Sequence, residues 1–135
     1  AEFLARREAL LPGALVAGVR IPRRPGRLGA HVRLPLRKAG DYPVAIVSLT
    51  AEVADGRLAR PVIAVGSVEP VARRWAALEA ALEGVSPDPA AGASAAAGLL
   101  SAFSPRDGIE APGWYRAEVL PALVRRALAS LEASA

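Results

Sequence analysis

The feature that most constrains the fold is a chain reversal at Asp55-Gly56, which separates two long apolar runs. This dipeptide tolerates the positive φ angles of a type I′ turn, so residues 44–53 and 58–68 are predicted to pair as an antiparallel hairpin. The first run alternates as a half-buried strand does, with one apolar face and another that becomes polar toward the turn. The apolar face consists of Ala45, Val47, Leu49, Ala51 and Val53.

Two further strands are predicted before the hairpin. Residues 28–36 form one, and residues 15–21 form a shorter one that ends at a connector rich in Pro, Gly and Arg. Pro35 and Pro61 each indicate a sheet edge or a bulge, because proline cannot donate a hydrogen bond to a ladder. The pattern therefore predicts a meander of three to four antiparallel strands with one face to cover.

The remaining sequence is predicted to supply the helices that cover this face. Glu69-Pro70 opens the first helix, since proline is favoured in a first turn, and Gly84 ends it. A turn-rich linker over residues 85–94 follows, and Ser94 is predicted to cap a short Ala-rich helix. The apolar stripe of the first helix consists of Val71, Trp75, Leu78 and Leu82.

The last helix is predicted to run from near Pro112 to about Glu132. Pro121 lies inside it and removes one backbone donor, so we expect a kink there or a later start. Tyr115 and Arg116 are expected to be structural, with the ring packed on the sheet and the guanidinium at a rim. The apolar positions of this helix are Trp114, Val119, Leu120, Leu123, Val124, Leu128 and Leu131.

Strands followed by helices predict an α+β two-layer sandwich, in which about three helices cover one face of the meander. The 135 residues are expected to form a single domain, with an initial strand and basic connector in 1–27, the sheet in 28–68 and the helices in 69–135. A parallel nucleotide-binding fold is disfavoured, because no G-x-G-x-x-G follows a strand and no P-loop is present. No apolar run approaches the length of a membrane span, so a cytoplasmic protein without membrane association is expected.

The composition argues against a self-sufficient enzyme. Without cysteine the chain has no disulfide, no thiolate metal site and no Cys nucleophile. His31 is the only histidine, so a zinc site would need carboxylates for nearly every other ligand, and no suitable cluster is present. A Ser-His-Asp triad would have to use His31, which lies in an Arg-rich stretch without a nearby carboxylate to orient it.

Positive charge is concentrated at the beginning of the sequence. Residues 1–40 hold nine basic and two acidic residues, a balance of +7, whereas residues 41–135 hold eight and eleven, a balance of −3. Such a block is typical of a chain that meets an anionic neighbour, and a solvated loop is the plainer alternative. The block has no aromatic residue after Phe3, which argues against sequence-specific binding of nucleic acid.

Four short motifs occur in order along nearly the whole chain. They are Leu11-Pro12-Gly13-Ala14-Leu15 with Val19-Arg20-Ile21-Pro22, then Arg37-Lys38-Ala39-Gly40-Asp41-Tyr42-Pro43-Val44, then Asp55-Gly56-Arg57 with Ala64-Val65-Gly66-Ser67-Val68-Glu69-Pro70, and finally Trp114-Tyr115-Arg116 with Arg125-Arg126-Ala127-Leu128. Their order and spacing resemble the C-terminal domain of the FAD-binding (medium) subunit of molybdenum hydroxylases. That family includes the flavoproteins of carbon monoxide dehydrogenase and xanthine dehydrogenase.

The resemblance implies an accessory part of an oxidoreductase. In this family a preceding domain holds most of the FAD, and the C-terminal domain closes over one side of the flavin and supports subunit packing. Electrons pass from a molybdopterin subunit through an iron–sulfur subunit to the flavin, and these subunits are the implied partners. The isolated domain is then not expected to be catalytic or to retain FAD. A scaffold module that uses its basic N-terminal third to engage an acidic partner is the alternative.

The resemblance also implies candidate cofactor-binding residues, namely Arg33, Arg37 and Asp41. The family places a Lys near the flavin, two residues after an aromatic, and the matching positions here are Arg33 and His31. An arginine keeps the positive charge that would stabilise a reduced, anionic flavin, although its planar fork differs in reach. The plainer alternatives are a solvent-facing Arg33 and an ion pair between Arg37 and Asp41 that fixes a turn.

Overall fold

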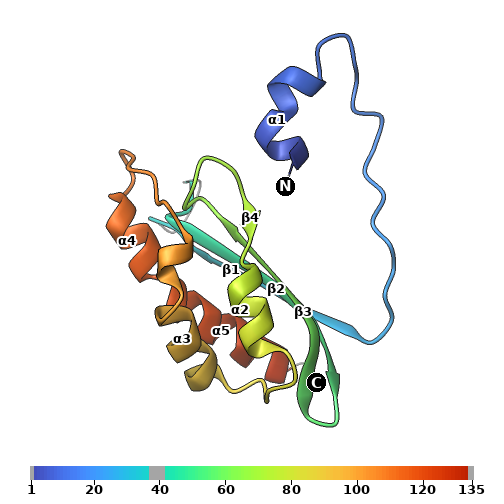
Figure 1. Ribbon diagram of the computed structural model, residues 1–135, viewed down its shortest axis with the longest axis vertical. Helices are drawn as coiled ribbons and strands as arrows, with labels where there is room; N and C mark the ends of the chain where they lie inside the picture. Colours follow the sequence, from blue (N-terminus) through green and yellow to red (C-terminus); the bar gives the residue numbers. More distant parts are fainter. Residues whose placement is uncertain (1, 37–41, 134–135) are drawn as a thin grey trace.

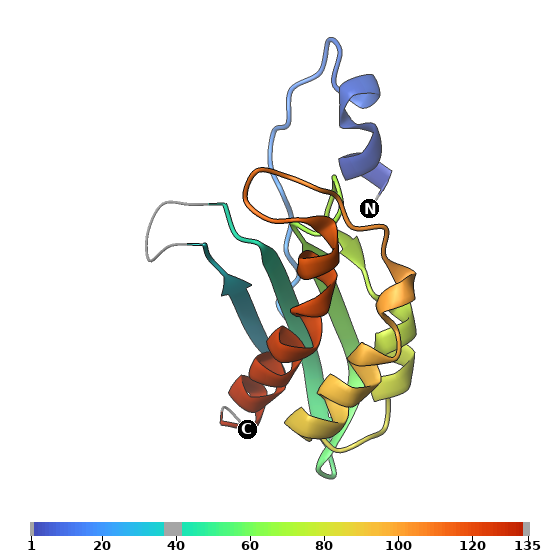
Figure 2. The ribbon, with the colours of Figure 1, turned by 90° about the vertical axis from the view of Figure 1, so that its left-hand side faces the viewer.

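The computed structural model describes residues 2–36 and 42–133, and in that part of the chain the body of the protein is a sheet with helices on one face (Figures 1 and 2). The sheet has the order β1-β2-β3-β4, and all neighbouring strands are antiparallel. The predicted meander and the α+β two-layer class are therefore confirmed. The strands are β1 (Arg27–Leu34), β2 (Ala45–Ala54), β3 (Arg57–Gly66) and β4 (Arg73–Arg74).

The helices cover the sheet unequally. α5 packs on β1 and β2, α2 packs on β3, and α3 packs on α5 in the same layer (Figure 2). The first helix, α1, lies apart from this layer (Figure 1). The helices are α1 (Glu2–Leu10), α2 (Ala76–Leu82), α3 (Pro89–Ala97), α4 (Gly113–Glu118) and α5 (Leu120–Glu132), with a short 3₁₀ turn at Leu100–Ala102.

The central hairpin forms as predicted. Asp55 and Gly56 have φ angles of 50° and 70°, the positive values that a type I′ turn requires. A bulge interrupts the pairing, because Thr50 faces Val62 whereas Glu52 faces Ala59. Two residues of β3 thus oppose one of β2, and one of these two is Pro61. The prediction that Pro61 indicates a bulge is confirmed.

The core lies between the sheet and the helices. Alternate residues of β2 are fully buried, as the predicted apolar face requires, while Val53 at the end of this face is half-buried. Beside the helices, Trp75 just before α2 and Phe103 just after the 3₁₀ turn meet edge to face with ring centroids 4.9 Å apart. The other large buried side chains are Leu49, Leu58, Ile63, Leu78, Leu120, Leu123, Leu128 and Leu131.

Helix α2 closes the outer edge of β3, which β4 pairs over only two residues. The backbone N–H of Ile63 donates to Glu79 Oε1 at 2.8 Å, and the N–H of Arg60 donates to the Glu83 carboxylate at 3.0 Å. The N–H of Trp75 donates to the Ile63 carbonyl at 2.9 Å. Two carboxylates one helical turn apart therefore satisfy backbone donors that an open edge would leave exposed.

The sequence prediction was wrong in the N-terminal region. Residues 15–21 are extended but form no strand, and Glu2–Leu10 forms a helix that was not predicted. A strand needs a neighbour for its backbone groups, and none of the residues that the structure describes supplies one here. Alternation of apolar residues indicates only which face of a strand is apolar, and carries no information about whether a partner is present.

Two helix starts also differ from the prediction. Glu69-Pro70 lies in a turn before β4, and the helix begins only at Ala76, although Trp75, Leu78 and Leu82 are buried as expected. The next helix begins at Pro89 rather than after Ser94. Its cap is Asp88, whose Oδ1 accepts from the N–H of Ala90 and Ala91 at 2.7 and 2.8 Å.

Pro121 interrupts the C-terminal helix as predicted. The chain forms α4 up to Glu118 and restarts as α5 at Leu120, with proline in the first turn of the second helix. Proline is tolerated there because its missing N–H would lack an intrahelical partner anyway.

Candidate functional site: the open face of the sheet

The face of the sheet turned away from the helix layer carries mostly small and polar side chains, with Ile46 and Val62 as the larger apolar ones. The core takes one set of alternate strand residues, so the other set lies on the opposite face, which we call the open face. The strand register arranges the open face in three rows across β1, β2 and β3. The rows are Arg33, Ile46 and Gly66; His31, Ser48 and Ala64; and Gly29, Thr50 and Val62.

Arg33, the first predicted site residue, is exposed on β1, in the row farthest from the Asp55-Gly56 turn. His31 lies two residues earlier on the same face, and its Nδ1 is 2.8 Å from Ser48 Oγ. The structure thus places Arg33, which matches the family's Lys, and His31, which matches the family's aromatic, on the same face. Arg37 and Asp41 lie outside the described residues.

The middle row of the open face carries short side chains on β2 and β3, namely Ser48 and Ala64. At Gly66 a Cβ would lie 3.5 Å from the Ile46 side chain, and at Gly29 a Cβ would lie 3.4 Å from Thr50 Cγ2. Glycine at these positions leaves the neighbouring side chains as the highest points of the surface. Positions without a Cβ would not obstruct a planar group that lay along the strands.

Charged side chains close the hairpin end of the open face. Arg27 donates to Thr50 Oγ1 and to the carbonyls of Thr50 and Arg60, and the Arg60 side chain pairs with Glu52. Hydrogen bonding from Arg60 holds the pKa of the Glu52 carboxyl below its ordinary value. This network fixes the bulge at residues 60–61 and lies at the hairpin end of the three rows.

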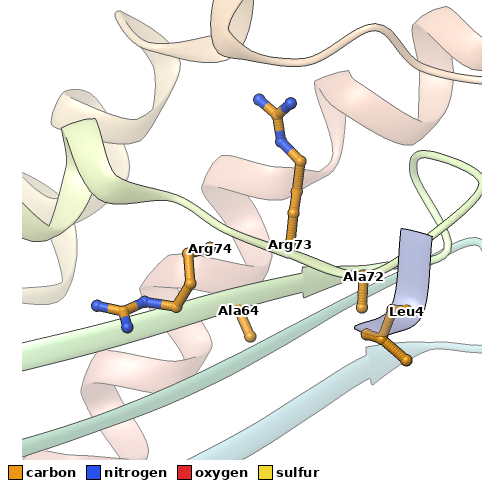
Figure 3. Close-up of a pocket in the computed structure, with 5 residues that line it drawn as sticks. All are labelled: Leu4, Ala64, Ala72, Arg73 and Arg74. Carbon is orange, nitrogen blue, oxygen red and sulfur yellow. The ribbon is translucent and has the colours of Figure 1, made fainter. Parts of the chain in front are cut away.

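A pocket of about 190 Å³ opens beside β3 and β4 (Figure 3). Its lining residues are Leu4, Ala64, Ala72, Arg73 and Arg74. In the close-up Arg73 points away from the side on which Ala64 and Ala72 lie. Its guanidinium lies over the Phe103 ring, with the central carbon 5.0 Å from the ring centre. The guanidinium nitrogen Nη1 pairs with Glu69 Oε2 at 3.3 Å. The pocket is smaller than the roughly 300–1,000 Å³ typical of small-molecule sites.

Arg116 holds several chain segments together, and the sequence prediction of its position was wrong. It was expected at a rim, but its side chain is completely buried. The guanidinium donates to the carbonyls of Val44 at 2.8 Å and Ser67 at 3.0 Å, and pairs with Glu110 at 2.9 Å. It also donates to the Ala111 carbonyl. One arginine thereby joins the start of β2, the turn after β3 and the loop before α4.

The aromatic residues around this clamp are exposed rather than packed on the sheet. Trp114 is 67% exposed and Tyr115 is 39% exposed, and their rings meet edge to face with centroids 5.7 Å apart. The prediction that the Tyr115 ring packs on the sheet was wrong, as was the placement of Trp114 in the apolar face of the helix. Arg116 occupies the buried position on α4, so its neighbours in sequence must point outward.

Among residues 2–36 and 42–133, no group of three His, Cys, Asp or Glu side chains could hold a metal ion. None of the helices described there is both long and apolar enough to span a bilayer.

Comparison with known proteins agrees with the fold and the motif order. The family model of the CO dehydrogenase flavoprotein C-terminal domain matches residues 30–131. No curated protein matches the chain in a sequence search.

Several solved structures share the fold. The chain is similar to carbon monoxide dehydrogenase from Oligotropha carboxidovorans, with 25% identity, a TM-score of 0.75 and coverage of 85% of this chain and 40% of that one. For carbon monoxide dehydrogenase from Hydrogenophaga pseudoflava the values are 28%, 0.70, 82% and 38%. Quinoline 2-oxidoreductase from Pseudomonas putida 86, with 24% identity, a TM-score of 0.70 and coverage of 79% and 37%, shares the fold. The chain thus spans about two fifths of each of these proteins. Because the family model matches most of its residues, the chain belongs to the CO dehydrogenase flavoprotein C-terminal domain family, within the molybdenum hydroxylase flavoprotein subunits.

Proposed function

We propose that this chain is the accessory C-terminal domain of an FAD-binding oxidoreductase subunit, and that its open face covers one side of the flavin. The observation that carries the proposal is the row of short side chains between Arg33 and the Arg27 network, on a domain of a flavoprotein family. A face of small residues bordered by a cation suits a planar ring that becomes anionic on reduction. The remainder of the FAD would be held by the preceding part of the subunit.

The residues present fit this limited role. Arg33 would lie at the border of the ring, while Ser48 and Ala64 would offer a low surface beneath it. Bound flavin would supply the redox chemistry, accepting electrons and passing them to an acceptor. The chain's own contribution would be to exclude water from one side and to favour the reduced anion electrostatically. The Arg37 and Asp41 positions are retained as cofactor-binding candidates on the resemblance alone.

The parent complex is proposed to relay electrons from a molybdopterin subunit through iron–sulfur clusters to FAD. Exposed aromatic residues support a role in subunit packing, since Tyr and Trp are enriched at protein interfaces. Trp114 and Tyr115 form such a surface beside the buried Arg116, which holds the backbone beneath them in place. The cytoplasm is the proposed location, because a sequence without cysteine lacks the disulfides common in secreted domains.

A second candidate is a scaffold role for the basic N-terminal third. Arg23 and Arg24 line a surface hollow of about 300 Å³ in the exposed connector before β1. The affinity for an acidic partner bound there should fall steeply as salt is raised from 50 to 500 mM. The reason is that salt screens exposed charges, with a Debye length of about 10 Å at 0.1 M and less at higher salt. Binding that is insensitive to salt would exclude this candidate.

The flavin proposal is tested on the intact subunit by measuring its flavin reduction potential. Arg33→Met should lower the two-electron potential on the order of 30 mV, which corresponds to a tenfold change in equilibrium constant, and Arg33→Lys should restore most of it. Arg125→Met, on the exposed side of α5, is the matched control. A shift at Arg33→Met no larger than that of the control would contradict the placement of Arg33. Stoichiometric FAD retained by these 135 residues alone would contradict the accessory role.

A further inference from the structure

The segment before β1 has the pattern of a strand without a neighbouring strand. In a strand over these residues, Leu15, Ala17, Val19 and Ile21 would fall on one side, and Val16, Gly18 and Arg20 on the other. Leu15 is 97% exposed, Val19 is 84% exposed and Ile21 is 83% exposed. Three large apolar side chains on one side of an extended segment indicate a face that is built to be covered.

Nothing in the described part of the chain covers this face. Residues 15–22 make no backbone hydrogen bond to residues 2–36 or 42–133. Pro22 and Pro25 interrupt the connector to β1, and the segment runs clear of the sheet and its helices (Figure 1). Residues 15–21 therefore combine backbone groups that have no partner strand with an apolar face that is not covered.

The comparisons indicate where a covering surface would come from. The family model begins at residue 30, so this segment lies outside the matched domain. This chain spans 38–40% of the similar carbon monoxide dehydrogenase chains, so most of each of those proteins has no counterpart here. A larger protein portion next to the segment could offer a sheet edge.

We propose that residues 15–21 add as an edge strand to a β-sheet in the protein portion that precedes this domain in the longer subunit. The face formed by Leu15, Val19 and Ile21 would complete the core beneath that sheet, and the backbone would pair with its edge. The segment would then belong structurally to the preceding portion and would tether the two parts. This inference rests on the proposed function, in that it takes the chain to be part of a longer flavoprotein subunit.

Hydrogen exchange followed by mass spectrometry tests the inference. It is measured on the complete gene product and on the 135-residue chain. The amides of residues 15–21 should exchange on the order of 100-fold more slowly in the complete gene product, because pairing protects them. Equal exchange in the two proteins would overturn the inference, as would a gene product with no folded portion ahead of Ala1. Slow exchange in the 135-residue chain would also overturn it, and its dependence on concentration would distinguish pairing with a second copy from pairing with β1.

A matched pair of variants tests the face. Val19→Asp places a charge on the proposed buried side and should speed exchange of the segment in the complete gene product roughly tenfold. Val16→Asp makes the same change on the other side and should alter exchange less than about twofold. Equal effects would overturn the assignment of the faces. Slow exchange in a complete protein that holds no FAD would refute the proposed function alone, whereas fast exchange in a protein that holds FAD would refute this inference alone.

Discussion

At the scale of single residues, Arg116 has the clearest structural role. Its guanidinium is buried and satisfies carbonyl groups of Val44, Ser67 and Ala111 that would otherwise lack donors in a dry environment. Arg116→Met should therefore lower the free energy of unfolding by about 3–5 kcal/mol, as measured by urea denaturation. Arg116→Lys should lower it less, because an ammonium keeps the charge but cannot span the same acceptors.

The control for this measurement is Arg125→Met, an arginine of α5 that is exposed. A surface substitution of this kind should change stability by no more than about 0.5 kcal/mol. If Arg116→Met were as mild as the control, the clamp would not contribute to folding. The resulting cavity and unpaired carbonyls would then have to be relieved by movement of the loop around Ala111.

Glu79 is expected to give the fold a measurable dependence on acid pH. Burial raises the pKa of the Glu79 carboxyl, but hydrogen bonds from Arg74 and the Ile63 N–H lower it more, so the net shift is downward. A lowered pKa in the folded state contributes stability that is complete above the ordinary value of about 4.3 and is lost as the pH falls through the folded value. The free energy of unfolding should therefore decline between about pH 5 and pH 3.

Glu79→Gln is predicted to flatten this decline and to lower stability at pH 7 by about 1 kcal/mol. Glu118→Gln, at an exposed position of α4, is the matched control and should leave both quantities unchanged. Denaturant unfolding at a series of pH values would decide the matter. A Glu79→Gln profile parallel to the wild-type profile would show that other carboxylates govern the acid response.

At the scale of elements, α3 approaches α5 closely because Gly92 faces it. A Cβ at position 92 would overlap Leu128 Cδ1, and Leu128 and Val124 beside it are fully buried. Gly92→Val should therefore destabilise the protein by about 1–3 kcal/mol through overpacking. Gly98→Val, at the exposed end of the same helix, is the control, and thermal unfolding of both variants is the measurement. Equal melting temperatures would mean that α3 shifts away without cost.

The helices and strands also show which structural features sequence patterns can predict and which they cannot. The hairpin, the bulge at Pro61 and the break at Pro121 were predictable, because turn chemistry and proline act through local backbone geometry. The start of α3 was missed because Asp88 and Ser94 are both capping residues, and only the local fold decided between them.

The candidate site was predictable only in part, for the same reason. Arg33 and His31 share a face because strand alternation requires it, whichever partner strands are present. The burial of Arg116 depends on three segments far apart in sequence, so no local pattern contained it. The Tyr115-Arg116 pair in the sequence suggested a structural role, but it did not show which of the two side chains would be buried.

At the scale of the whole molecule, the N-terminal region contributes little to the stability of the sheet and helix layer. Residues 3–10 are exposed throughout, and residues 12–26 are exposed along nearly all of their length. Removal of residues 1–23 should change the free energy of unfolding by less than about 1 kcal/mol, as measured by urea denaturation. Removal of residues 120–135, which include most of the buried leucines of the helix layer, should abolish cooperative unfolding. A large loss on N-terminal removal would show that α1 or its connector packs on the body.

The carboxylates of α2 also limit how this protein can associate with itself. Along β3 the outward backbone donors of Ile63 and Arg60 are already taken by Glu79 and Glu83, so a visiting chain finds no ladder to extend on that flank. On the opposite flank β1 is an edge strand of the sheet, where such pairing has a ladder to extend. A sheet that can be extended on one flank only pairs with one other sheet and cannot continue the ladder. Association through the edge of β1 should thus end at a dimer, rather than continue to fibrils with a cross-β core.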